Sequence, residues 1–363
     1  MYNDWIWETI GATKIPLGGG FHGGIFDHIT SLENLFRAWK EFKKNKSKKP
    51  DVITFSLNLE NNIFKLRDEL VAGSWVCGGY KKFSIKDPKP RTIHKATVGD
   101  RVLYQAIYRI LYPIFDKTFI FDSYSSRVGK GTHAGIKRLN ASLQKLSRNY
   151  TKPVYALKCD IKKFFDSIDH HILLMLIKQK IDCPETMELL EKIVDSFHKT
   201  LGKGLPLGNV TSQVFANVYM NPFDWFVKKQ LGEKSYIRYC DDFIILSNSR
   251  AQLSLLVSRL QVFLMDQLKL EMHPDKVIIR SLNSGIDFLG AVLLPYRMVP
   301  RTKTMNRIIK KSKKLFEQVK TGKLMTQRLK QSLSSYFGHL SHTKSYKAQS
   351  FLRLINTKIR DLP

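Results

Sequence analysis

The sequence is poor in acidic residues and has no long apolar run. Its 363 residues include 31 Asp and Glu against 60 Lys and Arg, which gives a formal net charge of +29. An ordinary enzyme for small anions rarely needs this excess, which favours a polyanionic partner, with nucleic acid ahead of an anionic membrane surface. A solvated cationic face on a protein without such a partner stays open. The apolar fraction of 43% excludes general disorder.

Cysteine pairs and membrane segments are also lacking. Cys77, Cys159, Cys183 and Cys240 lie far apart without a Cys-x-x-Cys spacing, which disfavours a disulfide framework or zinc ribbon and suits reduced thiols. No stretch approaches the ~20 apolar residues of a membrane span. Residues 1–5 do not start a signal peptide, because no basic region precedes an apolar run. We therefore expect a cytoplasmic protein with no membrane association.

Helical and extended patterns alternate along the chain. Helices are expected over residues 31–42, 100–115, 132–148, 169–180, 184–198 and 209–229, and from 301 onward. Extended segments are expected in a hairpin over residues 74–93 and at 154–160, 236–239 and 243–246. A basic run at 43–50 reads as a linker or a phosphate-facing arm. The alternation predicts an α/β or α+β domain in the middle of the chain.

Three carboxylates stand at the ends of the central strands. Asp241 and Asp242 lie between two apolar β-branched runs, and Asp160 ends a buried strand. Adjacent carboxylates repel each other unless cations neutralise them, and hard oxygen ligands suit Mg²⁺. A plain polar turn would also accept Asp241 and Asp242. Three acids together could hold the two metals of a phosphoryl-transfer site.

The motifs around these acids resemble those of reverse transcriptases. Tyr239-Cys240-Asp241-Asp242 resembles their Tyr-x-Asp-Asp box. The other boxes lie along the chain in the order expected of the family. Four precede this box, at 90–93 with Asp100, Arg101 and Gln105, and at 126–133, 160–165 and 204–213, and two come after it, at 273–276 and 285–290. The resemblance covers about residues 75–295. It implies an α+β right-hand polymerase fold with fingers, a palm of antiparallel sheet plus helices, and a short helical thumb.

The resemblance also implies domains and site residues. The boundaries are 1–73 for an N-terminal extension of uncertain role, 74–153 for fingers, 154–297 for the palm and 298–363 for a basic helical thumb. Asp160, Asp241 and Asp242 would be catalytic and would bind two Mg²⁺ ions, or Mn²⁺, together with the Ile161 carbonyl. Nucleotide-binding residues would be Arg91, Lys81 or Lys82, Phe165 as a gate against the ribose 2′-hydroxyl, Leu207, Gln213 and Lys276. Phe165 could instead be a core residue, and Lys276 a surface charge.

One departure narrows the resemblance. Most reverse transcriptases carry Pro-Gln-Gly where this chain has Pro206-Leu207-Gly208. The form with leucine, followed by Asn209 and Gln213, is similar to the enzymes of diversity-generating retroelements, which are prokaryotic or phage-encoded. Those enzymes copy a template RNA into cDNA and misincorporate opposite adenines. The resemblance implies dNTPs, a template RNA, an RNA/cDNA hybrid and a small basic pentameric accessory protein as partners.

Basic residues would hold the nucleic acid. Arg127 and Lys130 precede the helix expected over 132–148. Arg301, Lys303 and Arg307 open a tail with sixteen Lys and Arg against only Glu317 and Asp361. Lysine and arginine on phosphates give salt-sensitive binding without sequence preference. Two other functions stay open. One is a reverse transcriptase of antiphage defence, and the other is a non-catalytic RNA-binding scaffold, which the three intact acids disfavour.

Overall fold

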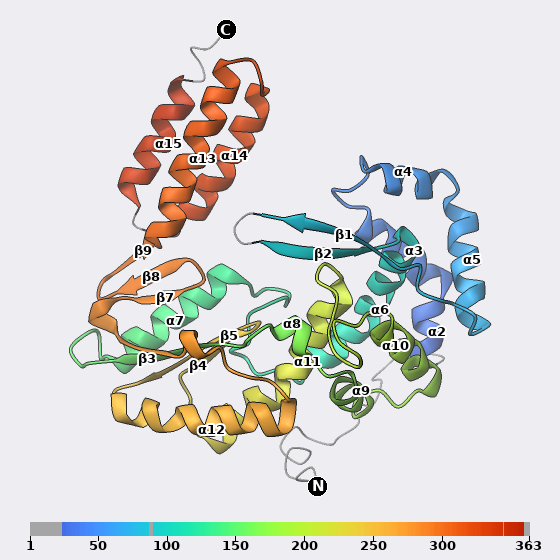
Figure 1. Ribbon diagram of the computed structural model, residues 1–363, viewed down its shortest axis with the longest axis horizontal. Coiled ribbons are helices and arrows are strands. Elements are labelled where there is room, and N and C mark those ends of the chain that lie inside the picture. The colour runs from blue at the N-terminus through green and yellow to red at the C-terminus, as the bar shows by residue number, and fades with distance from the viewer. Residues whose placement is uncertain (1–23, 87–89, 344, 359–363) are drawn as a thin grey trace. The chain divides into compact units, whose positions relative to one another are not determined.

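The computed structural model describes residues 24–86, 90–343 and 345–358, and Figure 1 shows its helices and short sheets. The α+β class expected from the sequence is confirmed, with antiparallel pairing between the strands. The chain divides into two units, residues 1–129, 159–243 and 257–276 in the first and 130–158, 244–256 and 277–363 in the second. The expected boundaries of fingers, palm and thumb stay predictions.

The first unit begins with helices that pack on one long helix. They are α2 (Ile25–Thr30), α3 (Leu32–Phe42), α4 (Pro50–Leu57) and α5 (Leu59–Val71), followed by α6 (Val98–Asp116). Ser31 caps α3 by accepting a hydrogen bond from the Asn34 N–H, and the Asn34 amide bonds the Ala106 carbonyl of α6 at 3.2 Å. The basic run ends at Pro50, which starts α4 because proline suits the first helical turn.

A hairpin precedes α6. Its strands β1 (Tyr80–Ile85) and β2 (Arg91–Ala96) pair antiparallel, as expected from the sequence. Residues 75–77, which the sequence includes in the hairpin expected over 74–93, do not form a strand. The Gly78 N–H bonds the Asp100 carboxylate at 3.1 Å, and a Cβ on Gly78 would lie 2.5 Å from the Thr97 methyl carbon. This segment is therefore fixed against the start of α6 rather than against a partner strand.

The central sheet holds the strands that end in the three acids. It has the order β4-β5-β3-β6, from β4 (Tyr236–Tyr239), β5 (Asp242–Ser247), β3 (Tyr155–Asp160) and β6 (Ile278–Ser281). The expected strands match β3, β4 and β5 within one or two residues. Nearly every residue of β4 and β5 is buried, which is why these strands read as continuous apolar runs.

Helices of the first unit follow β3 in the chain. They are α8 (Phe164–Ser167), α9 (His170–Lys178), α10 (Pro184–Asp195) and α11 (Val210–Trp225), and α12 (Arg250–Leu268) follows β5. The helix expected over 209–229 ends as an α-helix at Trp225 and continues as a π-helical turn, Phe226–Gln230. Pro222 lies inside α11 and lacks the N–H of a regular α-helical bond, so the hydrogen-bond pattern is perturbed near this end.

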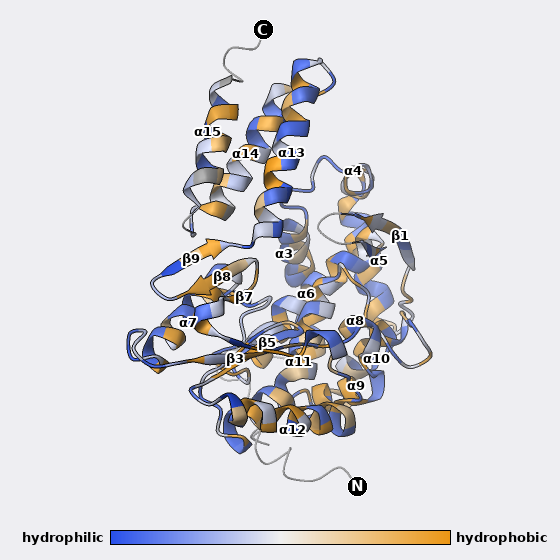
Figure 2. Ribbon diagram, turned by 60° about the vertical axis from the view of Figure 1, so that its left-hand side comes forward, coloured by the Kyte–Doolittle hydropathy of each residue, from blue (hydrophilic) through white to orange (hydrophobic). Residues whose placement is uncertain are grey.

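The second unit contains α7 (Thr132–Leu146), a small sheet and a helical bundle. The sheet pairs β7 (Ile286–Phe288), β8 (Ala291–Leu294) and β9 (Arg297–Pro300) antiparallel. The bundle consists of α13 (Thr302–Lys320), α14 (Thr326–Leu340) and α15 (Tyr346–Lys358), where the sequence predicts a helical tail. Figure 2 shows apolar and polar residues alternating along these helices, which bury a shared core that includes Ile308, Leu333 and Leu352.

Candidate active site

The three acids lie at the ends of neighbouring strands. Asp160 is the last residue of β3, and Asp242 is the first of β5, the strand beside β3 in the sheet. Cys240 links β4 to Asp241 in a left-handed conformation with φ of 58°. Burial raises the pKa of the Cys159 thiol to about 12, and the charges of Asp242 and Asp160 add to this increase. The structure therefore brings together acids that are 81 positions apart in the chain.

The electrostatics of these acids favour a cation. Burial, followed by the charges of Asp160 and then Asp242, raises the pKa of Asp241 to about 6. A cation would relieve the repulsion that these carboxylates exert on one another. The oxygen donors are of the kind that Mg²⁺ and Mn²⁺ prefer. The three side chains therefore fit a divalent metal site.

Lys276 already supplies one positive charge. Its Nζ lies 3.0 Å from Oδ1 of Asp160, and the Lys276 side chain is 40% exposed. Its backbone N–H bonds the His273 carbonyl, and the His273 N–H bonds the Asp160 carbonyl at 2.8 Å. The expected triphosphate contact of Lys276 stays a prediction, and the structure places the residue beside Asp160.

Ile161 is placed so that its carbonyl can assist the acids. It opposes Met272 in an isolated antiparallel bridge, between the bonds Lys162 N–H to Glu271 carbonyl and His273 N–H to Asp160 carbonyl. In this arrangement the N–H and C=O of Ile161 point away from residues 271–273. The expected role of this carbonyl as a metal ligand is compatible with that direction.

Arg238 fixes the turn that presents Asp241. Its side chain is fully buried in β4, and its five N–H donors all have acceptors. Two donors bind the Asp224 carboxylate at 2.7 Å, and the others reach Asn217, Ser123 and the Cys240 carbonyl. The bond to Cys240, 3.0 Å long, holds the left-handed residue directly before Asp241.

The segment with Leu207 lies against the hairpin. The His94 N–H of β2 bonds the Leu207 carbonyl at 3.1 Å, and the Leu205 N–H bonds the Phe165 carbonyl at 2.8 Å. Gly208 has φ of 120°, and a Cβ there would lie 3.0 Å from a methyl carbon of Ile93. Glycine is therefore required at 208, where the backbone approaches β2 closely.

Two expected nucleotide contacts share a face of the hairpin with Ile93. Lys81 opposes Lys95 and Arg91 opposes Ile85, so the register puts Lys81 and Arg91 on the face that carries Ile93. Both side chains are exposed. Gln213 is exposed in the first turn of α11, and Phe165 is half-buried with its ring 5.4 Å from that of Phe164. These positions keep all four residues as candidates.

The basic residues expected to bind nucleic acid differ in their surroundings. Arg127 is 7% exposed and binds the Asp116 carboxylate at 2.6 Å and the Ile120 carbonyl at 2.7 Å. These contacts favour a structural role for Arg127. Lys130 is half-buried, and Arg301 pairs with Asp287. Lys303 and Arg307 are exposed on α13, one turn apart, where they could follow a phosphate backbone.

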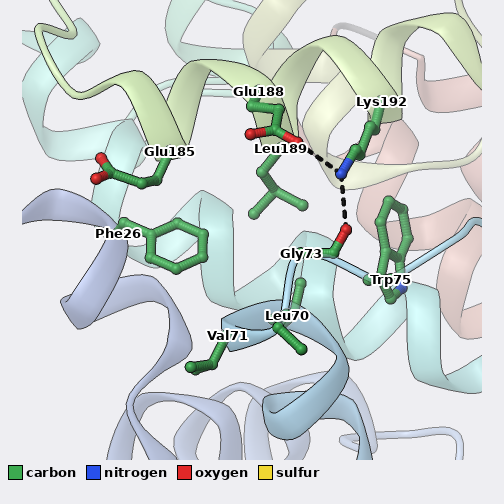
Figure 3. Close-up of a pocket in the computed structure, with 10 residues that line it drawn as sticks. Phe26, Leu70, Val71, Gly73, Trp75, Glu185, Glu188, Leu189 and Lys192 are labelled. Atoms are coloured by element: carbon green, nitrogen blue, oxygen red, sulfur yellow. Dashed lines mark hydrogen bonds and ion pairs between the residues drawn. The ribbon is translucent and has the colours of Figure 1, made fainter.

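Two of the hollows among the described residues of the first unit bear on where a site could lie. One, of ≈ 420 Å³, is lined by Lys162, Lys163, Lys199, Lys203 and Lys269 among others and suits an anion. The other, of ≈ 210 Å³, lies between α2, α5 and α10 and is shown in Figure 3. Its Lys192 binds the Gly73 carbonyl at 2.9 Å and Glu188 at 2.8 Å. The second hollow is largely apolar, and neither hollow is lined by Asp160, Asp241 or Asp242. We place the chemistry at these three acids because their carboxylates are the groups that fit a divalent metal.

Sequence reasoning did not identify Arg238, Asp224 or the contact of Lys276 with Asp160. A signal for Arg238 was available, since it is the lone charge in the apolar run 236–239. A charge in a buried strand needs a partner, because an unpaired buried charge is costly. The partner Asp224 lies on α11, and nothing in the spacing of the sequence identifies it.

Comparison with known proteins matches a family model to most of the middle of the chain. The model described as reverse transcriptase (RNA-dependent DNA polymerase) matches residues 81–293. Protein YkfC of Escherichia coli K12 is 25% identical over 272 residues, which cover 64% of this chain and 71% of YkfC. The group II intron-encoded protein LtrA of Lactococcus lactis is 24% identical, over 64% of this chain and 49% of LtrA.

Among solved structures, the chain is similar to an apo telomerase from Candida tropicalis truncated from its C-terminal domain. The identity is 14%, the TM-score is 0.46, and the likeness covers 61% of this chain and 55% of the telomerase chain. The chain thus spans about half the length of LtrA and of this telomerase chain. At this TM-score the likeness adds nothing to the family match.

No helix within residues 24–86, 90–343 and 345–358 combines the length and apolar character of a membrane span.

Proposed function

Because the chain belongs to the reverse transcriptase (RNA-dependent DNA polymerase) family, we propose that it makes cDNA from a template RNA by two-metal nucleotidyl transfer. One observation carries the proposal: Asp160 and Asp242 end neighbouring strands, and the charges of both acids raise the pKa of Asp241. In the proposed roles, Asp160, Asp241 and Asp242 would hold two Mg²⁺ ions, which would lower the pKa of the primer 3′-hydroxyl and neutralise negative charge on the leaving pyrophosphate.

The remaining residues position the substrates. Lys81 and Arg91 bind the triphosphate from one face of the hairpin, and Lys276 lies beside Asp160 to meet charge that develops at the reacting groups. Phe165 packs beneath the sugar, where its ring leaves no room for a 2′-hydroxyl. Its carbonyl is bonded to the Leu205 N–H, which ties this gate to the segment with Leu207.

The test is primer extension on an RNA template with Asp241→Asn. Loss of one metal-binding carboxylate lowers the rate by at least about 1,000-fold, because the charge that positions the ions is removed. Asp266→Asn is the matched control, since Asp266 is an exposed aspartate on α12 outside the site. It extends primers at the wild-type rate. Extension by Asp241→Asn at a rate near wild type would refute the metal assignment.

We further propose that the enzyme is error-prone and belongs to a diversity-generating retroelement. The support is Leu207, which lies against β2 and cannot form the hydrogen bond that a glutamine at this position would offer an incoming nucleotide. Pairing geometry is then less constrained, and misincorporation opposite template adenines is the expected result. A polymerase and an accessory pentamer that are both basic repel each other, so we place the template RNA between them.

Sequencing of cDNA made by Leu207→Gln tests this proposal. The error frequency opposite adenines falls by about 10-fold, because one restored hydrogen bond contributes roughly 1–2 kcal/mol of discrimination. Leu201→Gln is the control, since Leu201 is 94% exposed in the preceding loop. An error spectrum in Leu207→Gln identical to wild type would count against the role of Leu207. Equal, low error at all template bases in the wild type would remove the retroelement assignment.

A further inference from the structure

A side-chain cluster outside the active site joins His170, Asp195 and His198. His170 starts α9, Asp195 is the last residue of α10, and His198 lies in the loop after α10. Each residue offers one potential ligand atom, and these atoms all lie within 4.8 Å of one another. His170 is 3% exposed, whereas Asp195 and His198 are at the surface. The cluster therefore joins a buried ligand to an opening toward solvent.

His170 faces a hydrogen-bond acceptor at both ring nitrogens. Nε2 lies 2.8 Å from the Gly204 carbonyl oxygen, and Nδ1 lies 3.1 Å from Oδ1 of Asp195. A neutral imidazole has one N–H, so it satisfies one oxygen and directs a lone pair at the other. A buried lone pair facing a carboxylate is unfavourable. With the N–H on Nε2, donated to Gly204, the lone pair of Nδ1 faces Oδ1 of Asp195, and a metal ion between these two atoms would bind both.

The geometry suits a metal ion. A metal-binding histidine commonly donates its other ring N–H to a backbone carbonyl, as Nε2 of His170 can to Gly204. Ligands about 2.0–2.1 Å from a tetrahedral ion stand about 3.4 Å apart, close to the 3.1 Å between Nδ1 and Oδ1. Nδ1 of His198 accepts the Gly202 N–H at 3.2 Å, so this nitrogen is unprotonated, and a zinc ion bound through it would replace that hydrogen bond.

We propose that His170, Asp195 and His198 bind one zinc ion. Two imidazoles and one carboxylate are the donors that zinc prefers, whereas Mg²⁺ prefers oxygen ligands and water. The site is separate from the three acids in chemistry and in residues. The sequence shows no zinc spacing here, because His170 and His198 are 28 positions apart and meet only through the packing of α9 and α10.

The zinc ion would stabilise the loop that leads to Leu207. The Gly204 carbonyl accepts from His170, the Gly204 N–H bonds the Ile168 carbonyl at 2.8 Å, and the next N–H, of Leu205, bonds Phe165. Closing the cluster with an ion thus fixes residues 198–205 against the segment that carries the nucleotide gate. This positioning effect rests on the proposed function, whereas the zinc site itself does not.

Zinc content and thermal stability of the full chain test the site. The protein is stripped with a chelator, dialysed against zinc chloride and assayed for bound zinc by atomic emission, with melting followed by scanning fluorimetry. We expect one zinc ion per wild-type chain and a melting temperature raised by about 5 °C at a free zinc concentration about 100-fold above Kd. Magnesium chloride at the same concentration gives no such shift.

Variants separate the cluster from incidental zinc binding. His198→Ala and Asp195→Asn each lose the bound ion and the melting shift, and both side chains are exposed, so the chain still folds. His171→Ala is the control, because His171 is the next residue of α9, is exposed and lies outside the cluster. It retains zinc as the wild type does. Zinc binding by His198→Ala equal to wild type, or none in the wild type, overturns the site. Primer extension is not part of this readout, so the outcome does not depend on the proposed function.

Discussion

At the scale of single residues, Arg238 is the side chain that the site depends on without touching substrate. Its guanidinium is fully buried, pairs with the Asp224 carboxylate through two bonds and also holds the Cys240 carbonyl. Such a pair is not strong evidence of net stability, because desolvation offsets much of the attraction. We infer that the pair matters for geometry, because Asp224 fixes the Arg238 side chain, which in turn holds the backbone of Cys240 directly before Asp241.

Arg238→Ala therefore leaves Asp224 charged, buried and without its main partner. We expect the free energy of unfolding to fall by about 3–5 kcal/mol, measured by urea denaturation. The double variant Arg238→Met with Asp224→Leu regains much of this loss, because no uncompensated charge remains. It stays impaired in primer extension, since the Cys240 carbonyl loses its donor. Full activity in the stable double variant would show that Arg238 does not position Asp241.

At the scale of elements, one carboxylate ties α4 to its neighbours. Asp51, in the first turn of α4, lies 2.7 Å from Lys95 of β2 and 2.5 Å from Arg101 of α6. Partial burial acts to raise the pKa of Asp51, but hydrogen bonds from Lys95 and Arg101 outweigh it, so the net pKa lies below its usual value. The folded chain therefore binds this proton less readily than the unfolded chain does.

The pH dependence follows from that sign. The contribution of Asp51 to stability is present above the ordinary aspartate pKa, near 3.8, and is lost as the pH falls through the lower folded value. We expect Asp51→Asn to lower the free energy of unfolding by about 1 kcal/mol at pH 7 and by almost nothing near pH 2, as measured by urea denaturation at both pH values. Asp68→Asn, an exposed aspartate on α5, is the control. A loss in Asp51→Asn that is equal at both pH values would contradict the ion-pair explanation.

Helices and strands could be predicted where apolar residues recur at a regular spacing or where a capping residue marks the start. Elements that lack both features could not be predicted. The helix from Leu32 follows a Ser cap and has apolar residues at helical spacing. The strands β3 to β5 are mostly apolar and buried, interrupted by Lys158 and Arg238. The short strands β7, β8 and β9 have three or four residues each, too few for a period to show. Residues 75–77 resemble a strand in composition, but Cys77 and the next residue, Gly78, bond the Asp100 carboxylate instead of a partner strand.

The candidate site was predictable to the extent that motif residues carry it. The order of the boxes implied Asp160, Asp241 and Asp242, and the strand order now places two of them on neighbouring strands. Arg127 was chosen for its charge, but its contact with Asp116 depends on a fold that the spacing does not reveal. The pairing of Asp224 with Arg238 and the contact of His170 with His198 likewise depend on the fold and cannot be read from the spacing of the sequence.

At the scale of the whole molecule, the net charge of +29 predicts strongly salt-dependent binding to nucleic acid. Each lysine or arginine on a phosphate contributes about 0.7–0.9 to the slope of log K against log salt concentration. Replacing Lys303 and Arg307 of α13 with glutamine lowers that slope by about 1.5, measured by fluorescence anisotropy with an RNA/DNA hybrid. The paired change Lys40→Gln with Lys65→Gln, on the exposed faces of α3 and α5, is the control. Equal slopes in both double variants would remove α13 from the interface.

The bundle of α13, α14 and α15 draws its apolar core from its own residues, between Met305 and Ile355. Its outer lysines and arginines can therefore change without altering how the three acids are packed. Such independence is what lets an enzyme adapt to a new nucleic-acid partner by surface substitution alone, so divergence among relatives should be greatest on this exterior and least at the strand ends. If these helices bind nucleic acid as proposed, exchanging them between homologues should change that binding and leave the packing of the three acids as it is.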